Sequence, residues 1–541
     1  MKPSRLHIFF LLLVAILSGC AAPTPPATAT AIPTETPAVS NIPWWNQTVF
    51  YEIFVRSFND SDGDGIGDFN GITAKLDYLQ NLGVRGLWLM PIHPSPSYHG
   101  YDVTDYYAVN PQYGTMDDFK HMLEEAHKRD IKIIIDLVFN HTSIKHPWFQ
   151  QALTVGSEYT EWYKWRDSDP GTRGPWGAQA WYKATNGKYY YAINQVGMPD
   201  LNYDNPALRE ETKKIASFWL QDVGIDGFRM DEVRYLSEDK KLADADSNHA
   251  YLEEWGTYYR SINPQAFTVG EVWTDNGNVK KYTNTDTEMT SAFNFDLSSA
   301  IFKSINESSN STVRFLLQTT VRDFPQQDNS NFLTNHDMAR VMNSFGTDKE
   351  QKARVAASIL LTAPGIPFIY YGEEIGMAGT KPDELIRTPM QWTDGNGAGF
   401  TTAKPWEAVN LDYTTVNVAA QEGQDSLLEH YRTLIQFRNA HPALQFGKTF
   451  IGDSSTKKIL TYLRSRDEET MLIVINLDDK AISDYTIEFS SGPLSGSYSG
   501  ASLLDDTVIA PVTANDKGGF DAYTPLAGIP PYSITVIQLT Q

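Results

Sequence analysis

The chain has 541 residues and a formal net charge of -22, so it is long enough for two or three domains around a large core. Its content of 41% hydrophobic and 12% aromatic residues indicates a globular protein. The excess of acidic residues argues against nucleic acid or an anionic membrane surface as a partner. A neutral substrate fits this charge better.

The first residues differ in composition from the rest of the chain. Lys2 and Arg5 precede the apolar run "IFFLLLVAIL", which is short for a transmembrane helix but has the length of a signal-peptide core. The run ends in "LSGC", which resembles a bacterial lipobox, and we expect residues 1–20 to form a lipoprotein signal peptide. Cys20 is the only cysteine, so no intramolecular disulfide is possible. We expect Cys20 to carry a lipid anchor, and the alternative is an ordinary small residue after a signal peptide.

Residues 21–43, "AAPTPPATATAIPTETPAVSNIP", are rich in Pro, Thr and Ala and have no apolar periodicity. This composition is typical of an extended, disordered linker. The N-terminal region therefore predicts a lipid-anchored protein on the extracellular side of a bacterial membrane.

The stretch "NDSDGDGIGDFNGI", residues 59–72, has the spacing of a calcium-binding loop. It lacks the closing Glu of an EF-hand, and the β-branched and aromatic residues before it predict a strand rather than a helix. Hard oxygen ligands between tight glycine turns still suit calcium. The predicted metal ligands are Asp60, Asp62, Asp64, the carbonyl of Ile66, and Asp68. The alternative is a solvated turn.

Eight apolar, strand-like runs follow one another from residue 48 to residue 376, and amphipathic stretches such as "TMDDFKHMLEEAHKRD" separate most of them. This alternation indicates a buried parallel sheet covered by helices, and eight units match an α/β fold of the (β/α)8 TIM barrel type. A doubly wound open sheet would carry a glycine-rich phosphate turn after its first strand, and none is visible. The runs are 48–58, 84–92, 131–141, 225–233, 266–273, 291–297, 330–337 and 366–376.

Two further regions are predicted outside this repeat. Residues 142–205 form a long insertion rich in Trp and Tyr after the third strand, and we expect a small subdomain there. The barrel then comprises residues 44–141 and 206–444. Short alternating strands in residues 445–541 predict a C-terminal antiparallel β-sandwich.

Polar residues gather at the carboxyl ends of four predicted strands, which is the face of a barrel where active sites lie. A single acid at such a position could simply be a partner in a loop salt bridge. The convergence of polar residues from four strands instead indicates a functional site. No Cys/His cluster offers a zinc site, and no Ser or Cys has a nucleophile setting. The residues are Asp136, Asn140, His141, Arg229, Asp231, Glu271, His336 and Asp337.

Paired carboxylates on a barrel suit cleavage of glycosidic bonds. One carboxylic acid protonates the leaving oxygen, and the other attacks the anomeric carbon or activates water. Aromatic side chains near the barrel mouth would offer flat faces to sugar rings, although they can equally be core residues of the insertion.

The motifs "DLVFNH" (136–141), "GFRMDEV" (227–233), "GEVW" (270–273) and "FLTNHD" (332–337) resemble, in this order, the conserved regions of glycoside hydrolase family 13, the α-amylase family. "GLWLMP", "MPDLN" and "GIPFIYYGEE" resemble its additional regions. The resemblance implies that Asp231 is the nucleophile and Glu271 the general acid/base. It implies that Asp337 binds sugar hydroxyls and stabilises the transition state.

The same resemblance implies a substrate-binding set around these acids. His141 and His336 would bind hydroxyl groups of the reacting glucose, and Tyr101 would stack beneath its ring. Arg229 would orient Asp231 and keep it ionised by lowering its pKa. His99 and Asp102, which flank Tyr101 in "YHGYDVTDYY", complete the set.

For the loop at residues 59–72, the resemblance implies a structural calcium, since the oligo-1,6-glucosidase and neopullulanase branches carry a similar loop after the first strand. A second family calcium site between barrel and insertion would use Asn140 and Asp200. Members of the family often have a histidine at this site, four residues after the nucleophile, whereas this chain has Tyr235. This departure leaves the second site in doubt.

Sequence signals for the branch of the family are mixed. "RTPMQW" (387–392) resembles oligo-1,6-glucosidases and trehalose synthases, whereas "MPDLN" (198–202) resembles an intermediary group that includes α-amylases. Glu232, after the nucleophile, matches neither. Because starch cannot cross a membrane, a surface-anchored hydrolase would act on polymers.

We therefore expect an α-amylase that acts on starch and maltooligosaccharides. We expect it to bind no nucleic acid and to be a monomer. The alternatives are an α-glucosidase or oligo-1,6-glucosidase, a transglycosylase such as trehalose synthase, and a non-catalytic starch-binding lipoprotein. The intact Asp231, Glu271 and Asp337 argue against the last of these.

Overall fold

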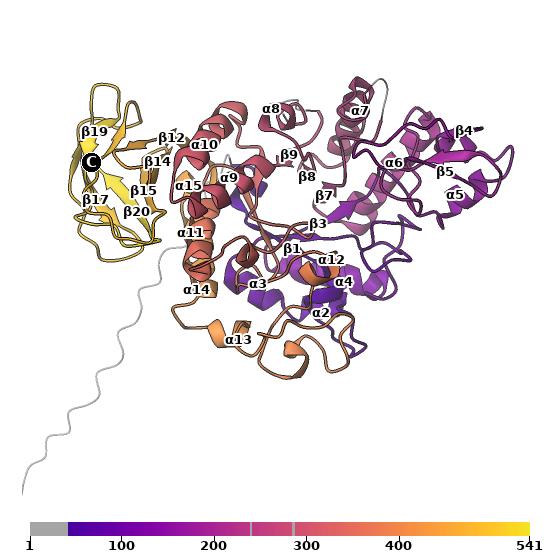
Figure 1. Cartoon of the computed structure of the whole chain (residues 1–541), viewed down its shortest axis with the longest axis horizontal. Helices are drawn as coiled ribbons and strands as arrows, with labels where there is room; N and C mark the ends of the chain where they lie inside the picture. Colours follow the sequence, from indigo (N-terminus) through magenta and orange to yellow (C-terminus); the bar gives the residue numbers. More distant parts are fainter. Residues whose placement is uncertain (1–41, 238–240, 284–286) are drawn as a thin grey trace, which may run out of the picture. The chain divides into compact units, whose positions relative to one another are not determined.

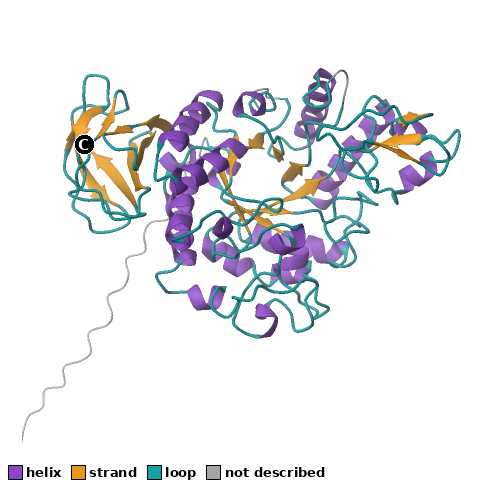
Figure 2. Cartoon of the chain, in the orientation of Figure 1, coloured by secondary structure: helices purple, strands orange, loops and turns teal. Residues whose placement is uncertain are grey.

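The structure is a computed structural model that describes residues 42–237, 241–283 and 287–541. Figure 1 shows it along the chain, and Figure 2 shows it by secondary structure. The predicted signal peptide, Cys20 and residues 21–41 of the predicted linker lie outside the described residues. Within the described part of the chain, no helix is both long enough and apolar enough to cross a membrane.

Eight parallel strands close into a barrel, in the order β1-β11-β10-β9-β8-β7-β3-β2. This confirms the predicted (β/α)8 fold. The strands are β1 (Phe50–Ile53), β2 (Gly86–Leu89), β3 (Lys132–Leu137), β7 (Gly227–Met230), β8 (Phe267–Gly270), β9 (Ser291–Phe293), β10 (Asn329–Asn331) and β11 (Ile366–Tyr370).

Large aromatic side chains fill the barrel interior. The rings of Phe50 on β1 and Phe368 on β11 stack with centroids 4.5 Å apart, and Phe267 on β8 stacks on Phe50 at 5.1 Å. Trp88 on β2 and Phe293 on β9 belong to the same buried cluster. The interior is therefore a packed core, and space for a ligand is left only at the strand ends.

Helices cover the outside of the barrel, and most of them bury one apolar face against it. In α4 (Met116–Lys128), Thr115 and Asp118 form a capping box at the N-terminus, and Phe119, Met122 and Ala126 are buried. The main outer helices besides α4 are α3 (Leu76–Leu82), α6 (Pro206–Ser217), α7 (Asp246–Ile262), α9 (Phe295–Asn306), α10 (Ser311–Asp323), α11 (Lys349–Thr362) and α14 (Leu427–Ala440).

Two predicted strands are longer than the observed ones. The run 48–58 contains β1 but continues into the short helix α1 (Val55–Phe58), because its apolar residues stay buried after the strand ends. The run 330–337 contains only the end of β10 (Asn329–Asn331). His336 and Asp337 therefore lie on the loop that follows the strand.

The predicted insertion, residues 142–205, contains helix α5 (Pro147–Ala152) and a three-stranded antiparallel sheet. Its strands are β4 (Trp165–Arg166), β6 (Tyr189–Tyr191) and β5 (Trp181–Lys183), in that order. Many of its aromatic residues are core residues: Phe149 packs against Tyr163 and Tyr190 with ring centroids 5.0 Å apart in both pairs.

The C-terminal region is antiparallel, as predicted. One sheet has the order β12-β14-β15-β20-β17-β18, and a second has the order β13-β16-β19. Apolar residues from both sheets share one buried cluster. The strands are β12 (Lys448–Ile451), β13 (Asp453–Ser454), β14 (Ile459–Arg466), β15 (Glu469–Asn476), β16 (Ile487–Phe489), β17 (Ser497–Ser502), β18 (Val512–Thr513), β19 (Phe520–Tyr523) and β20 (Ile534–Thr540).

Candidate active site

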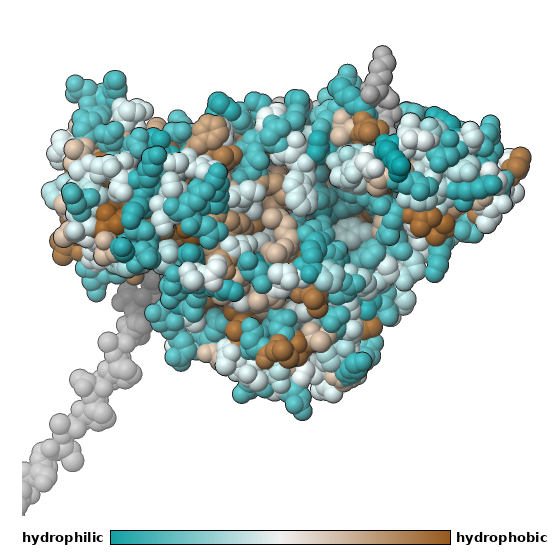
Figure 3. All heavy atoms as spheres, in the orientation of Figure 1, coloured by the Kyte–Doolittle hydropathy of each residue, from teal (hydrophilic) through white to brown (hydrophobic). Residues whose placement is uncertain are grey.

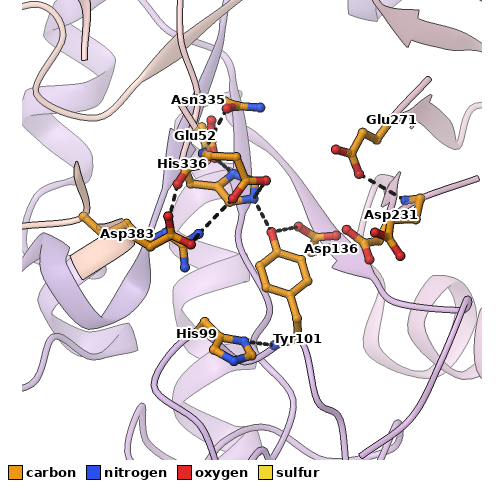
Figure 4. Close-up of polar contacts among 12 residues, drawn as sticks. Glu52, His99, Tyr101, Asp136, Asp231, Glu271, Asn335, His336 and Asp383 are labelled. Carbon is orange, nitrogen blue, oxygen red and sulfur yellow. Dashed lines mark hydrogen bonds and ion pairs between the residues drawn. The ribbon is translucent and has the colours of Figure 1, made fainter. Parts of the chain in front are cut away.

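A pocket of about 320 Å³ lies at the carboxyl ends of the barrel strands, and Figure 4 shows the polar contacts around it. Such a position is usual for active sites of this barrel. The pocket brings together six predicted site residues from separate parts of the chain. Its lining is His99, Tyr101, His141, Asn194, Gln195, Met198, Asp231, Glu232, Glu271, Asp337, Asp383 and Arg387.

Arg229 on β7 holds three carboxyl groups at the bottom of the site. Its Nη1 lies 2.8 Å from Oδ1 of Asp136 and 2.6 Å from Oδ1 of Asp231. Its Nη2 lies 3.0 Å from Oε2 of Glu271. The guanidinium is buried beneath the ring of Trp88, 5.2 Å from the ring centroid. One rigid cation therefore fixes the two carboxyl groups that the sequence predicts to be catalytic.

Burial raises the pKa of Asp231 and of Glu271 to about 7 each, while Arg229 lowers both pKa values. The sequence predicts a low pKa for Asp231 because of Arg229; the arginine does act in that direction, but burial outweighs it. Two carboxylates beside one another resist simultaneous ionisation. Asp231 makes the shorter contact to Arg229, which favours the ionised form of Asp231 over that of Glu271.

Asp337 lines the same pocket, with its side chain one-third exposed (33%). Its Oδ1 lies 2.9 Å from Nη2 of Arg387, and its Oδ2 lies 3.3 Å from Nε2 of His336. Burial acts to raise the pKa of Asp337, but the positive charges of Arg387 and Arg229 lower it below its ordinary value. This carboxylate is therefore ionised and can accept hydrogen bonds from a ligand.

Tyr101 and His336 form a buried polar chain with Glu52. Nδ1 of His336 lies 2.5 Å from Oε1 of Glu52, and its Nε2 lies 2.6 Å from the hydroxyl of Tyr101. The Tyr101 hydroxyl also lies 3.1 Å from Oδ2 of Asp136. Burial lowers the pKa of His336 to about 3, so its imidazole is neutral. The chain fixes the orientation of the Tyr101 ring.

His141 closes the side of the pocket next to the insertion. Its Nε2 donates to the carbonyl of Tyr101 at 3.0 Å, so Nδ1 accepts a bond from Nδ2 of Asn194 at 3.2 Å. The same Asn194 amide donates to Oε2 of Glu232 at 2.8 Å. Burial lowers the pKa of His141 to about 4. A neutral histidine and a residue of the insertion therefore shape this wall together.

His99 lines the pocket, but Asp102 does not. Nδ1 of His99 accepts a hydrogen bond from the backbone of Tyr101 at 3.1 Å. Oδ1 of Asp102 accepts hydrogen bonds from the hydroxyls of Ser95, at 2.5 Å, and Ser97. Asp102 therefore holds the loop that carries Tyr101, rather than facing the pocket.

Seven residues of the site are absent from the predicted set, among them Gln195 and Met198 of the pocket lining. Glu52 carried one signal, since it is an acid inside an otherwise apolar strand. Arg387 opens the motif "RTPMQW", and Glu232 directly follows the predicted nucleophile in "GFRMDEV". Nothing in the sequence pattern marks Asn194, or Asp383, whose Oδ2 lies 3.1 Å from Nη2 of Arg387.

The Asp-rich loop, residues 59–72, brings three of its predicted ligands together. Carboxylate oxygens of Asp60, Asp62 and Asp68 lie within 4.8 Å of one another. Oδ1 of Asp64 instead accepts a hydrogen bond from the backbone of Ile66 at 2.7 Å. Three converging carboxylates suit a hard divalent cation such as calcium, so this donor set fits the predicted metal.

Asn140 and Asp200, the predicted second calcium site, have a different environment. Oδ1 of Asn140 is buried and has no hydrogen-bond partner among the described residues, and its Nδ2 lies 3.4 Å from Oε2 of Glu232. In the described ranges, no cluster of three acidic or histidine ligand atoms includes Asp200. The site remains a prediction.

A parallel barrel with two carboxyl groups held on one arginine at its carboxyl-end face matches what a glycosidase of the two-carboxylate type needs. The profile of the family described as "Alpha amylase, catalytic domain" matches residues 52–447. The chain belongs to this family, glycoside hydrolase family 13, and is a glycosidase by that membership.

The names of the curated relatives state different activities. Alpha-amylase 3 of Dictyoglomus thermophilum is 43% identical over 446 residues, which cover 81% of this chain and 86% of the relative. The oligo-1,6-glucosidase of Parageobacillus thermoglucosidasius is 34% identical over 514 residues, covering 81% and 91% of the two chains.

The solved structures that this chain resembles also include enzymes with different activities in their names. An α-amylase from H. orenii superposes with a TM-score of 0.78 at 40% identity, covering 91% of this chain and 99% of that one. A trehalose-6-phosphate hydrolase from Bacillus licheniformis superposes with a TM-score of 0.79 at 29% identity, covering 92% and 100%.

Proposed function

We propose that this glycosidase is an α-amylase that hydrolyses internal α-1,4-glucosidic bonds of starch and maltooligosaccharides with retention of configuration. The observation that carries the proposal is the guanidinium of Arg229, which lies 2.6 Å from Asp231 and 3.0 Å from Glu271. A fixed pair of carboxyl groups, one ionised and one protonated, is what a retaining glycosidase needs.

In this mechanism, the Asp231 carboxylate attacks the anomeric carbon while Glu271 donates its proton to the leaving oxygen. The covalent glycosyl intermediate is then hydrolysed by a water molecule that gives its proton to Glu271. The neutral imidazoles of His141 and His336 and the Asp337 carboxylate bind hydroxyl groups of the reacting glucose. The ring of Tyr101 lies beneath that glucose.

Starch-type substrates are favoured by two observations. The relative named alpha-amylase 3 is 43% identical to this chain, against 34% for the oligo-1,6-glucosidase. His99 and Gly100 stand before Tyr101, as in the open cleft of endo-acting amylases. The second candidate, an α-glucosidase or a related transglycosylase, is favoured by Arg387 of "RTPMQW", which narrows the pocket through its contacts with Asp337 and Asp383.

We also propose a structural calcium ion at Asp60, Asp62 and Asp68, where it would neutralise three carboxylates and hold the loop. The predicted lipid anchor at Cys20 would keep the enzyme on the outer side of a membrane, where polymers are accessible. Neither feature takes part in the chemical steps.

The test is a time course of products from starch and from isomaltose, together with the anomeric form of the first product by NMR. The proposal predicts maltooligosaccharides in the α-configuration from starch, and little product from isomaltose. Asp231→Asn and Glu271→Gln should each lower kcat by about three orders of magnitude or more, with the melting temperature nearly unchanged. An initial β-product would contradict a nucleophilic Asp231.

A further inference from the structure

A second pocket lies on the outside of the barrel, away from the catalytic carboxylates. It measures about 460 Å³ and is formed by α8 (Asn276–Val279), α9 and α10. This size is in the range of small-molecule sites. None of its lining residues lines the active-site pocket. Figure 1 shows α8, α9 and α10 next to one another, and Figure 3 shows apolar residues among hydrophilic ones over α9 and α10.

An exposed aromatic ring stands in this pocket. Phe315 on α10 is 60% exposed, whereas Val313 and Leu317 of the same helix are buried against the barrel. No other aromatic ring of the described residues packs against Phe315. Exposing a phenylalanine to water is unfavourable, and its free face offers a stacking surface of the kind that the apolar face of a sugar ring prefers.

A buried polar atom borders the same pocket. Asn276 begins α8 and is only 4% exposed, and its Oδ1 has no hydrogen-bond partner among the described residues. Its Nδ2 lies 3.5 Å from the hydroxyl of Thr320. An unpaired buried carbonyl oxygen costs free energy unless a donor reaches it. A ligand with hydroxyl groups could supply that donor.

The charges around the pocket balance one another. Three cations and three carboxylates line it, and some already pair: Nζ of Lys280 and a guanidinium nitrogen of Arg322 lie 3.0 and 2.7 Å from the Asp323 carboxylate. A site for an anion or a cation would show an excess of one sign. The six residues are Lys280, Lys303, Arg322, Asp275, Asp296 and Asp323.

We propose that this pocket is a secondary binding site for chains of α-linked glucose, separate from the active site. Ring stacking on Phe315, donors and acceptors of both kinds, and no net charge fit a neutral polyhydroxyl ligand. The choice of α-glucan among such ligands rests on the proposed function. A second contact with the same polymer would raise the local concentration of substrate at the active site.

Helix α8 of this pocket lies close in the chain to the proposed catalytic acid. α8 follows Glu271 closely in the chain, and Trp273 between them is 51% exposed. The ring of Trp273 stacks on Phe295, the first residue of α9, with centroids 4.5 Å apart and an angle of 10°. Exposed aromatic rings therefore occur both near the catalytic acid and at the pocket.

Electrophoresis of the full chain in native gels containing amylose tests the site directly. Phe315→Ala should weaken retardation by amylose about fivefold, whereas Phe315→Tyr should retain it, because a tyrosine ring stacks equally well. Leu411→Ala is the matched control, since Leu411 is also exposed (98%) but lies elsewhere. The kcat/KM for maltotriose should be the same in all three variants, which also shows that they are folded.

Equal retardation of wild type and Phe315→Ala would overturn the site, and so would no retardation of the wild type. These outcomes concern binding at Phe315, whereas the proposed function is tested separately by the release of sugar from starch. A protein that binds amylose through Phe315 but releases no sugar from starch would keep the secondary site and refute the α-amylase.

Discussion

The backbone N–H of Glu232 donates a hydrogen bond to Oε2 of Glu271 over 3.1 Å. Glu232 has a left-handed backbone, with φ of 46°, which is costly for a residue with a Cβ atom. Its carboxyl group accepts a bond from Asn194 of the insertion. Glu232 therefore links the insertion to the predicted acid/base, which gives a positioning role to a residue whose identity the sequence left unexplained.

This role can be tested with Glu232→Gln and Glu232→Ala. Burial, together with the neighbouring Asp231 and Glu271, raises the pKa of Glu232 well above its ordinary value. This shift favours the neutral form of the side chain, and a glutamine keeps both its shape and the acceptor for Asn194. We expect kcat/KM of Glu232→Gln within about threefold of wild type.

Glu232→Ala removes one acceptor from the amides of Asn194 and Asn140, which then compete for Nδ1 of His141, and losing such a bond costs about 1–3 kcal/mol. It should lower both the melting temperature and kcat/KM. Equal activity of the alanine and glutamine variants in kinetic assays would exclude a positioning role.

A second prediction concerns the buried acid Glu373, after β11. Its Oε1 accepts from the hydroxyl of Tyr431 at 2.8 Å, while Oε2 has no partner among the described residues. Burial raises its pKa from 4.5 to about 8. The folded state therefore binds this proton more tightly than the unfolded chain, and the resulting stability is lost as pH rises from 4.5 through 8.

Glu373→Gln removes this ionisation. The variant should melt at a higher temperature than wild type above pH 8, and the difference should shrink near pH 5. Glu124→Gln, at a side chain that is 66% exposed, should show no such pH dependence. Calorimetric scans at both pH values would make the comparison, and a difference that does not vary with pH would contradict the assignment.

Some parts of the fold and of the site could be predicted from the sequence alone, and others could not. Apolar strands alternating with amphipathic helices predict the barrel, because burial on both faces leaves a strong pattern. Glu271 and Asp231 could be predicted because they end such strands. Glu52 and Asn194 could not, because their roles depend on side chains hundreds of residues away or on the path of the insertion. Strand ends were also missed where burial continues beyond the hydrogen-bonded ladder, as at Phe332.

Metal removal is the third prediction. Asp60, Asp62 and Asp68 repel one another unless a cation lies between them, so EDTA should lower the melting temperature. A ligand at about 100 times its dissociation constant contributes roughly 2.7 kcal/mol. Asp62→Asn should abolish this effect, whereas Asp64→Asn should preserve most of it, because the Asp64 carboxylate lies outside the cluster of Asp60, Asp62 and Asp68. An unchanged melting temperature and no calcium by elemental analysis would show a solvated turn.

The last prediction concerns where the enzyme cuts. An exo-acting glucosidase closes the pocket around the terminal glucose, whereas His99 and Gly100 before Tyr101 leave room for the chain to continue. A chain bound on both sides of the scissile bond supplies binding energy that can lower the barrier at the reacting centre. Maltoheptaose should therefore be cleaved far faster than maltose, and the viscosity and iodine colour of amylose should fall before much glucose appears. Steady release of glucose with the iodine colour retained, or faster cleavage of isomaltose than of maltoheptaose, would instead establish the α-glucosidase, with the contacts of Arg387 to Asp337 and Asp383 closing its pocket.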